Sequence, residues 1–182
     1  CEICKGKRFK DEVTAIKYNG VSIDMLLKMT VDECIQFFRK YNQTKIVNKL
    51  LPLQSVGLGY VSLGQSSNTL SGGEAQRIKL ASFIGKGDQI EKTFFIFDEP
   101  TTGLHFHDVK KLLNTFDKLI RMGHSILVIE HNLDMISCSD YIIDLGPEGG
   151  DKGGNIIAEG TPEDIIKNKV SFTGYYLKKK II

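Results

Sequence analysis

Two short apolar runs, with an amphipathic segment between them, constrain the fold of this chain more than any other feature. Residues 93–97 (TFFIF) and 125–129 (SILVI) have the composition of buried strands. Between them, residues 107–122 carry apolar side chains on one helical face, and Gly123 is well placed to end that helix. Strands that alternate with helices usually form a parallel sheet, so the pattern predicts a mostly parallel α/β sheet flanked by helices.

The segment before this unit is predicted to be mainly helical. Residues 22–57 follow a helical pattern, and Thr30 and Glu33 form a T-x-x-E capping box at the start of one helix. Pro52 is expected to break or bend a second helix. Residues 13–18 are predicted to form a short strand.

The segment after the unit is predicted to form a hairpin and a last helix. Residues 141–145 and 155–159 flank a glycine-rich turn, as the two strands of a hairpin do. Thr161 and Pro162 are expected to cap the last helix, because proline is favoured at the first helical position. The lysines at 178–180 are expected to be a solvated end.

Size and charge exclude some classes of protein. A chain of 182 residues is enough for one domain, or for a domain with a small appendage, and a net charge of +2 is too small to argue for nucleic acid or a membrane. No apolar run approaches the roughly 20 residues of a membrane span, and no secretion signal is recognisable. We therefore expect a cytoplasmic protein with no membrane partner. Because the chain begins at Cys1 and not Met, we expect a piece of a longer protein.

The first candidate site is the run Ser71-Gly72-Gly73-Glu74. Ser71 and Glu74 are placed as a second capping box, which accounts for the start of a helix but not for two consecutive glycines. Glycine costs about 1 kcal/mol relative to alanine in a helix, so the pair favours a close approach by another backbone or by an anion. Because the N–H groups at a helix amino terminus bind phosphate, this run is a candidate phosphate site.

Acidic residues and a histidine follow the two predicted strands. Asp98 and Glu99 end the first strand, and His131 follows the second, so parallel pairing would bring them to the same edge of the sheet. One carboxylate could hold Mg²⁺ through water, the other could face an attacking water, and the histidine could donate to a phosphate oxygen. Acidic strand ends and loop histidines are also common without such a function. Three more histidines are expected to be incidental loop residues: His105, His107 and His124.

In this order, the motifs resemble those of the ATP-binding cassette family. LSGGEAQR (70–77) matches its signature, FFIFDE (94–99) its Walker B strand, and His131 its switch histidine. The resemblance narrows to the UvrA family, the damage-recognition subunits of the bacterial excinuclease, and to its carboxyl-terminal part. It rests on further runs, with His105 where most cassettes have aspartate: CEICKGKRF (1–9), TTGLH (101–105), IEHNLDMI (129–136), DYIIDLGPEGGDKGG (140–154) and EGTPEDI (159–165).

The resemblance implies that two cassettes pair head to tail, with each ATP between the Walker A loop of one cassette and the signature of the other. On the ATP of its own cassette, Asp98 would help to hold Mg²⁺, Glu99 would orient or deprotonate the attacking water, and His131 would sense the γ-phosphate. The residues that would contact the ATP of the other cassette are Ser71, Gly72, Gly73 and Gln76.

A complete nucleotide site needs a Walker A loop, G-x-x-x-x-G-K-[ST], which this sequence lacks. Its only near match ends at Gly85-Lys86, with Leu80 in place of the first glycine and Gly87 after the lysine. Gln65 lies too near the signature to be the Q-loop glutamine. The chain is therefore expected to need an upstream part of its own chain, and to be a poor ATPase alone.

The amino end is expected to be half of a zinc module. Cys1 and Cys4 form one C-x-x-C pair, and a four-cysteine site needs two, so Zn²⁺ is expected only with an upstream C-x-x-C. Lys5, Lys7 and Arg8 could touch DNA phosphates or could form a solvated basic turn. The remaining cysteines are expected to be buried thiols: Cys34 and Cys138.

These expectations divide the chain into 1–20 (second half of a zinc module), 21–69 (helical signature subdomain) and 70–182 (carboxyl-terminal part of a second nucleotide-binding domain). The resemblance implies nucleotide excision repair within the SOS response, in the bacterial cytoplasm at the nucleoid. It also implies damaged double-stranded DNA, a UvrB-type repair subunit and a second UvrA copy as partners. Two alternatives stay open: the ATPase of a transporter, or a non-catalytic DNA-binding or interaction module whose active surface is 22–57.

Overall fold

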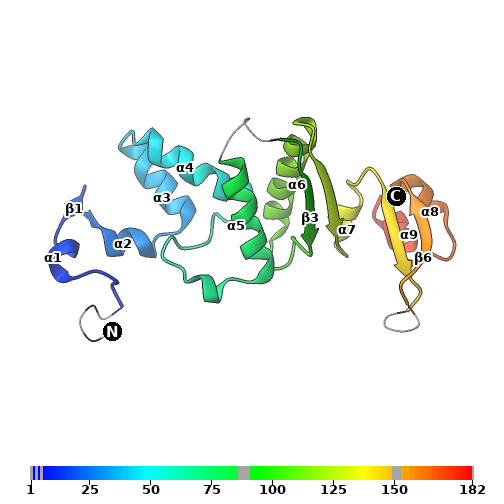
Figure 1. Ribbon diagram of the computed structural model, residues 1–182, viewed down its shortest axis with the longest axis horizontal. Coiled ribbons are helices and arrows are strands. Elements are labelled where there is room, and N and C mark those ends of the chain that lie inside the picture. The colour runs from blue at the N-terminus through cyan, green and yellow to red at the C-terminus, as the bar shows by residue number, and fades with distance from the viewer. Residues whose placement is uncertain (1, 3, 5, 86–90, 149–152, 182) are drawn as a thin grey trace. The chain divides into compact units, whose positions relative to one another are not determined.

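The computed structural model describes residues 2, 4, 6–85, 91–148 and 153–181. The chain forms two compact units, Cys1–Leu127 and Val128–Ile182, and the boundary between them falls inside strand β4 Ser125–Ile129 (Figure 1). In the described ranges, no helix combines the length and the apolar character that crossing a membrane requires. Several residues named above lie outside these ranges: Cys1, Lys5, Lys86, Gly87 and positions 149–152 of the predicted turn.

The first unit opens with the helical region that the sequence predicts. Its elements are α1 Asp11–Thr14, β1 Lys17–Tyr18, β2 Val21–Ser22, α2 Ile23–Lys28, α3 Val31–Lys40 and α4 Thr44–Ser55. The strand predicted at 13–18 is wrong for its first half, because α1 takes Val13 and Thr14 and only Lys17–Tyr18 pairs with β2. Asp11 and Glu12 occupy the first turn of α1, where acidic side chains stabilise a helix.

Helices α3 and α4 share one apolar core. The predicted capping box forms at Thr30 and Glu33 and fixes the start of α3. The prediction of a buried thiol is confirmed for Cys34, which is fully buried. The buried residues of this core are Val31, Cys34, Ile35, Phe38 and Val47.

Pro52 does not break α4, which continues to Ser55. A proline inside a helix removes one hydrogen bond and crowds the preceding turn. Its neighbours Leu50, Leu51 and Leu53 pack against the α3–α4 core. This burial stabilises the helix on both sides of Pro52, so a break is wrong, while the alternative, a bend, stays a prediction.

The chain after α4 folds back over the start of α3 and includes a short 3₁₀ turn, η1 Ser67–Thr69. The first two N–H groups of α3, on Val31 and Asp32, donate to backbone oxygens of this loop at 2.9 and 3.0 Å. The N–H of Gly64 donates to the Leu27 oxygen at 2.7 Å. A Cβ on Gly64 would lie 2.7 Å from that same oxygen, so this close approach requires glycine.

A strand–helix–strand unit follows α5 Gly72–Ile84. It consists of β3 Phe94–Asp98, α6 Phe106–Arg121 and β4 Ser125–Ile129, within one or two residues of the predicted bounds. The two strands pair with their arrows pointing the same way in Figure 1. Gly123 follows α6 with φ +89°, as expected of a helix-ending glycine. The predicted parallel pair is confirmed.

One face of β3 is covered and the other is exposed. The Phe95 ring lies 4.7 Å from that of Phe83 on α5, and the Phe97 ring lies 4.8 Å from that of Phe116 on α6, between centroids. Alternate residues of β3 and β4 leave large apolar side chains exposed: Phe94, Ile96, Leu127 and Ile129. The prediction of buried strands therefore holds for one face of this strand pair only. No described element of the strand–helix–strand unit covers the other face.

The second unit contains the predicted hairpin, β5 Ile142–Gly146 paired antiparallel with β6 Asn155–Gly160. With β1–β2 also antiparallel, the described strands form three two-stranded sheets. The expectation of a mostly parallel sheet is therefore wrong for the described residues. Only the strands joined by a helical crossover, β3 and β4, are parallel.

Three helices accompany the hairpin: α7 Leu133–Ile136, α8 Pro162–Lys167 and α9 Phe172–Ile181. The capping of α8 by Thr161, with Pro162 at the first position, is confirmed. However, α8 is not the last helix, because the lysine triplet lies in α9, where Lys180 pairs with Asp134 at 2.7 Å. Cys138 is exposed, so the expectation of a buried thiol is wrong there.

Candidate functional site

The amino terminus of α5 is fixed by a capping box and one tyrosine. Ser71 Oγ accepts from the N–H of Glu74 at 3.2 Å, and Glu74 Oε2 accepts from the N–H of Ser71 at 2.8 Å, as predicted. Tyr60 donates its O–H to Glu74 Oε1 at 2.6 Å. The Tyr60 bond, followed by the Ser71 bond, lowers the pKa of Glu74, so this carboxylate is ionised and fixed at neutral pH.

The two glycines of this helix start have different surroundings. Gly73 is buried, and a Cβ there would lie 3.1 Å from Arg77 Nη1 and 3.4 Å from the Glu99 oxygen. Gly72 is exposed, and a Cβ there would meet nothing within 4 Å. Packing within the chain therefore explains Gly73 but not Gly72. No described residue accepts a hydrogen bond from the N–H of Gly72 or Gly73.

Arg77 is fully buried one turn further along α5. Its Nη1 donates to the backbone oxygen of Pro100 and, at 3.4 Å, to that of Thr102. Nε and Nη2 have no hydrogen-bond partner among the described residues. Burial lowers the pKa of the guanidinium, and nearby Tyr60 and Glu74 partly offset that shift.

Asp98 and Glu99 form an exposed acidic turn at the carboxyl end of β3. Asp98 lies on the exposed face of the strand, and its N–H donates to Gln76 Oε1 at 3.3 Å. Glu99 has φ +46°, an uncommon backbone conformation for a residue other than glycine, and Thr102 donates to its carboxylate at 3.3 Å. The first unit thus packs the start of α5 against this turn.

His131 belongs to the second unit, directly after β4. Its backbone N–H and that of Asn132 donate to Glu130 Oε2 at 3.0 and 3.1 Å. These bonds fix the backbone after the strand and leave His131 an exposed residue. The role expected for His131 at the γ-phosphate stays a prediction.

The structure describes one of the two predicted zinc ligands, Cys4, and two of the three predicted DNA-contact residues, Lys7 and Arg8. Backbone N–H groups of Gly6 and Arg8 lower the pKa of the Cys4 thiol, which favours the thiolate that zinc requires. Lys7 pairs with Asp11 at 3.0 Å, and Arg8 donates to the backbone oxygen of Gly64. Among the described residues, no three His, Cys, Asp or Glu side chains are grouped as a metal site would need.

The three histidines expected to be incidental differ in burial. His105 and His107 are exposed, with ring centroids 5.6 Å apart. His124 is buried, and its Nδ1 accepts from the N–H of Thr93 at 3.2 Å. Its ring lies 5.5 Å from that of Phe83, so His124 is a packing residue and not an incidental loop residue.

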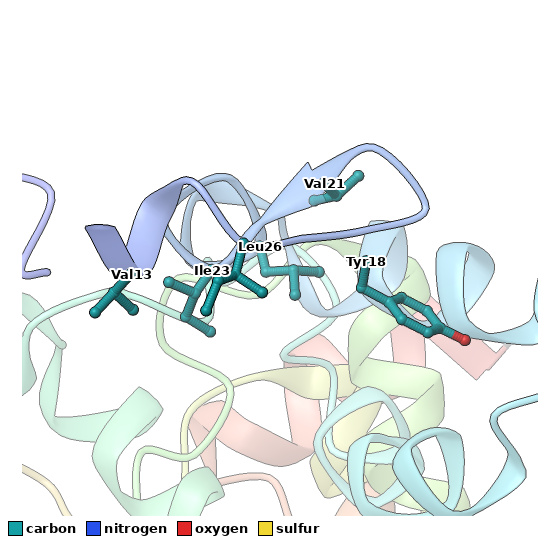
Figure 2. A pocket seen from close by; sticks show the side chains of 6 residues that line it. Val13, Tyr18, Val21, Ile23 and Leu26 are labelled. Atoms are coloured by element: carbon teal, nitrogen blue, oxygen red, sulfur yellow. The ribbon is translucent and has the colours of Figure 1, made fainter. Parts of the chain in front are cut away.

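An apolar hollow lies elsewhere in the first unit, between α1, the β1–β2 pair and α2 (Figure 2). Its lining consists of Val13, Ile16, Tyr18, Val21, Ile23 and Leu26. A nucleotide needs charged and hydrogen-bonding groups around its phosphates, whereas this lining has no charged side chain and its side chains are apolar apart from the Tyr18 hydroxyl. The hollow is therefore not the candidate site.

Tyr60 and Arg77 are the residues of this site that the sequence did not single out. Tyr60 is 14 positions from its partner Glu74, and Arg77 is 23 positions from Pro100. A charged residue on the apolar side of a helix was the available signal for Arg77. No local pattern marked Tyr60.

Comparison with known proteins agrees with the motifs. No family model matches the chain. The chain is 58% identical over 179 residues to the UvrABC system protein A of Clostridium perfringens, a match that covers 98% of this chain and 19% of that protein. The chain thus spans about a fifth of the length of this relative.

Two solved structures are also similar. The structure of UvrA2 from Deinococcus radiodurans matches with a TM-score of 0.81 and 39% identity, over 98% of this chain and 22% of that one. A bacterial Atm1-family ABC exporter with ATP bound matches with a TM-score of 0.50 and 21% identity, over 86% of this chain and 27% of the exporter, which shows a shared fold alone. Partial, high-identity matches of this kind fit a carboxyl-terminal part of UvrA, and the chain belongs to the UvrA family of ATP-binding cassette proteins.

Proposed function

We propose that this chain supplies one half of a composite ATP site in a protein of nucleotide excision repair. The observation that carries the proposal is the open amino terminus of α5. Gly72 is exposed, its N–H has no acceptor among the described residues, and a Cβ there would meet no described atom within 4 Å. Because a helix amino terminus carries partial positive charge, this end suits the γ-phosphate of an ATP held by another cassette.

The acidic turn would serve a second ATP, bound to the cassette of this chain. Asp98 offers an exposed carboxylate, the ligand type that Mg²⁺ prefers, and would hold that ion through water. Mg²⁺ would neutralise charge on the phosphates when bound. His131 would donate to the γ-phosphate.

Glu99 would orient the attacking water and take its proton. The water oxygen forms a bond to the γ-phosphorus while the bond to the bridging oxygen breaks, giving ADP and phosphate. Thr102 holds the Glu99 carboxylate from one side, which limits its rotation. Because the sequence has no Walker A loop, this chemistry requires that loop from another segment.

The proposal extends to the partners of the whole protein. Its relatives are named as parts of the UvrABC system, so we infer damaged double-stranded DNA, a UvrB-type subunit and a second UvrA copy as partners. The Cys4 thiol, with two backbone donors around it, fits half of a zinc site together with Cys1 and an upstream C-x-x-C. Lys7 and Arg8 already have partners within the chain, so contact with DNA phosphates would require them to exchange partners.

The test is Glu99→Gln in the full-length protein. The substitution keeps the shape of the side chain and removes the proton acceptor, so ATP turnover is expected to fall by about 10²-fold or more. Binding of damaged DNA, measured by fluorescence anisotropy, is expected to change by less than about threefold. Asp117→Asn, which changes an exposed carboxylate on α6, is the matched control. Full turnover in the Glu99 variant would refute the catalytic assignment.

A further inference from the structure

We propose that Arg77 is a positioning residue that couples the phosphate-facing start of α5 to the acidic turn of the same unit. This inference rests on the proposed function, which assigns the two ends of the link to two different ATP molecules. Arg77 itself touches neither ATP in that scheme. Its role is to make the geometry around Glu99 depend on the position of α5.

The contacts form a direct mechanical link. Arg77 Nη1 donates to the backbone oxygens of Pro100 and Thr102, which lie on the loop just after Glu99. Gly73, in the first turn of α5, lies so close to the Glu99 oxygen that a Cβ would be 3.4 Å away. Because one guanidinium group holds two carbonyls, α5 cannot shift along its axis without moving this loop or losing those bonds.

A second link runs beside the first. Gln76 Oε1 accepts from the N–H of Asp98 at 3.3 Å, one residue before Glu99. Arg77 and Gln76 are neighbours on α5 and hold the turn on both sides of Glu99. The turn is therefore attached to the helix through its backbone, and this attachment leaves the Asp98 and Glu99 side chains exposed.

Packing alone does not require an arginine at position 77. The side chain is fully buried, and among the described residues no carboxylate accepts a hydrogen bond from it and two of its nitrogens have no partner. Buried charges are often replaceable by apolar side chains of similar size without loss of stability. This arrangement indicates a positional role, because Nη1, held at the end of a rigid planar group, donates to two backbone oxygens that an apolar side chain could not bond.

The expected consequence is communication between the two ATP sites. Ser71 and Gly72 would contact the ATP of the other cassette, while Glu99 would act on the ATP of its own. Engagement of the first ATP would set the position of α5, and Arg77 would pass that position to Glu99. A displacement of about 1 Å at a catalytic group can lower a rate by about 10²-fold, so a small helix shift is sufficient.

The experiment is a double-mutant cycle on ATP turnover in the full-length protein, with Gly72→Ala and Arg77→Lys alone and combined. Arg77→Lys keeps the charge but replaces the rigid planar group that positions Nη1 with a flexible ammonium group, so kcat is expected to fall by about tenfold with KM within about twofold. Arg121→Lys, an exposed arginine on α6, is the control and is expected to leave both constants unchanged. The melting temperature of each variant checks folding separately.

The cycle distinguishes the outcomes. If Arg77 transmits the effect of the α5 start to Glu99, the kcat of the double variant is expected to be at most about twofold lower than that of the slower single variant. Independent effects would multiply, and that result overturns the coupling, as would an unchanged kcat in Arg77→Lys. Glu99→Gln is measured in the same series, so that failure of one proposal can be told from failure of the other. If Glu99→Gln loses turnover but the effects of Gly72→Ala and Arg77→Lys multiply, the proposed function stands and only the coupling through Arg77 is refuted.

A measurement that needs no Arg77 variant covers the case in which Arg77→Lys does not fold. Hydrogen exchange at residues 98–102 is followed with ATP in the Glu99→Gln protein, with and without Gly72→Ala. The link predicts faster exchange at 98–102 when Gly72 is replaced, because a poorly engaged α5 would loosen the turn. Identical exchange in both proteins would contradict the proposal.

Discussion

The amino termini of helices α3 and α5 have the same capping residues but different surroundings. Each starts with a hydroxyl residue and a glutamate three positions later, and both capping boxes form. At α3, the next two N–H groups donate to the oxygens of Val61 and Gly59. At α5, the corresponding N–H groups of Gly72 and Gly73 have no acceptor among the described residues. A capping box therefore sets where a helix begins, and the surrounding loop decides whether that end is available to a ligand.

The difference has a physical cause in the residues that follow each cap. Val31 is apolar and buried, and the loop after α4 packs over the start of α3, where the Val31 N–H donates to the Val61 oxygen. Gly72 has no side chain, so at this position there is no apolar surface whose burial would hold a loop over the start of α5. A helix amino terminus whose N–H groups are bonded by a loop stabilises the fold, whereas one whose N–H groups have no acceptor within the described chain can donate them to a ligand.

The largest effect is expected from Ser71→Arg in the full-length protein. An arginine would put bulk and positive charge where the proposed phosphate binds, and ATP-dependent pairing of the cassettes is expected to be lost. Analytical ultracentrifugation with and without ATP measures this. Thr44→Arg, at the exposed start of α4, places the same side chain at a helix end without the glycine pair and is expected to pair normally. Normal ATP-dependent pairing of the Ser71 variant would remove the basis for a functional difference between α3 and α5.

A middle-sized effect is expected from two glycine substitutions. Gly64→Ala would press a Cβ to 2.7 Å from the Leu27 oxygen in the loop that closes α3. This overpacking is expected to destabilise the chain by about 1–3 kcal/mol. Gly72→Ala meets no atom and is expected to leave stability unchanged or to raise it by up to about 1 kcal/mol. Urea unfolding followed by circular dichroism compares the two, and equal losses would show that the start of α5 is as closed as that of α3.

The smallest effect is a difference in acid sensitivity between the two capping carboxylates. The pKa of Glu33 is lowered by Thr30 alone, whereas the pKa of Glu74 is lowered mainly by Tyr60. A lowered folded-state pKa gives stability that is present above the unfolded value of about 4.3 and is lost as the pH falls through the folded value. Tyr60→Phe is therefore expected to raise the pKa of Glu74, move that loss to higher pH and leave Glu33 unchanged. Carboxyl-carbon NMR titration between pH 6 and 3 measures both groups, and an unshifted Glu74 would contradict the assignment to Tyr60.

Much of the fold followed from local patterns. The starts of α3, α5 and α8 were predicted from side chains that bond within three residues of the cap, and the bounds of β4 were predicted without error. The errors arose where distant packing outweighed a local rule. Pro52 remains inside α4 because leucines on both sides of it are held by α3. A further helix, α9, follows the predicted last helix because Leu177 packs against the hairpin core, while its lysine triplet is exposed, as predicted.

The candidate site was predictable only in its motifs. Ser71, Gly72 and Asp98 were identified from short runs, because their spacing along the chain is itself the signal. The links that hold them were not predictable. Tyr60 reaches Glu74, and Arg77 reaches the loop after Glu99, across 14 and at least 23 positions of sequence.

The sequence by itself determined the family, the motifs, and the places where most helices and strands begin, since these depend on residues a few positions apart. Only the tertiary structure decided that Gly73 is required by packing while Gly72 is open, and that Arg77 lies buried against the acidic turn. The physical reason is range. A capping hydrogen bond is fixed by neighbours along the chain, whereas burial depends on which distant segments the fold brings together.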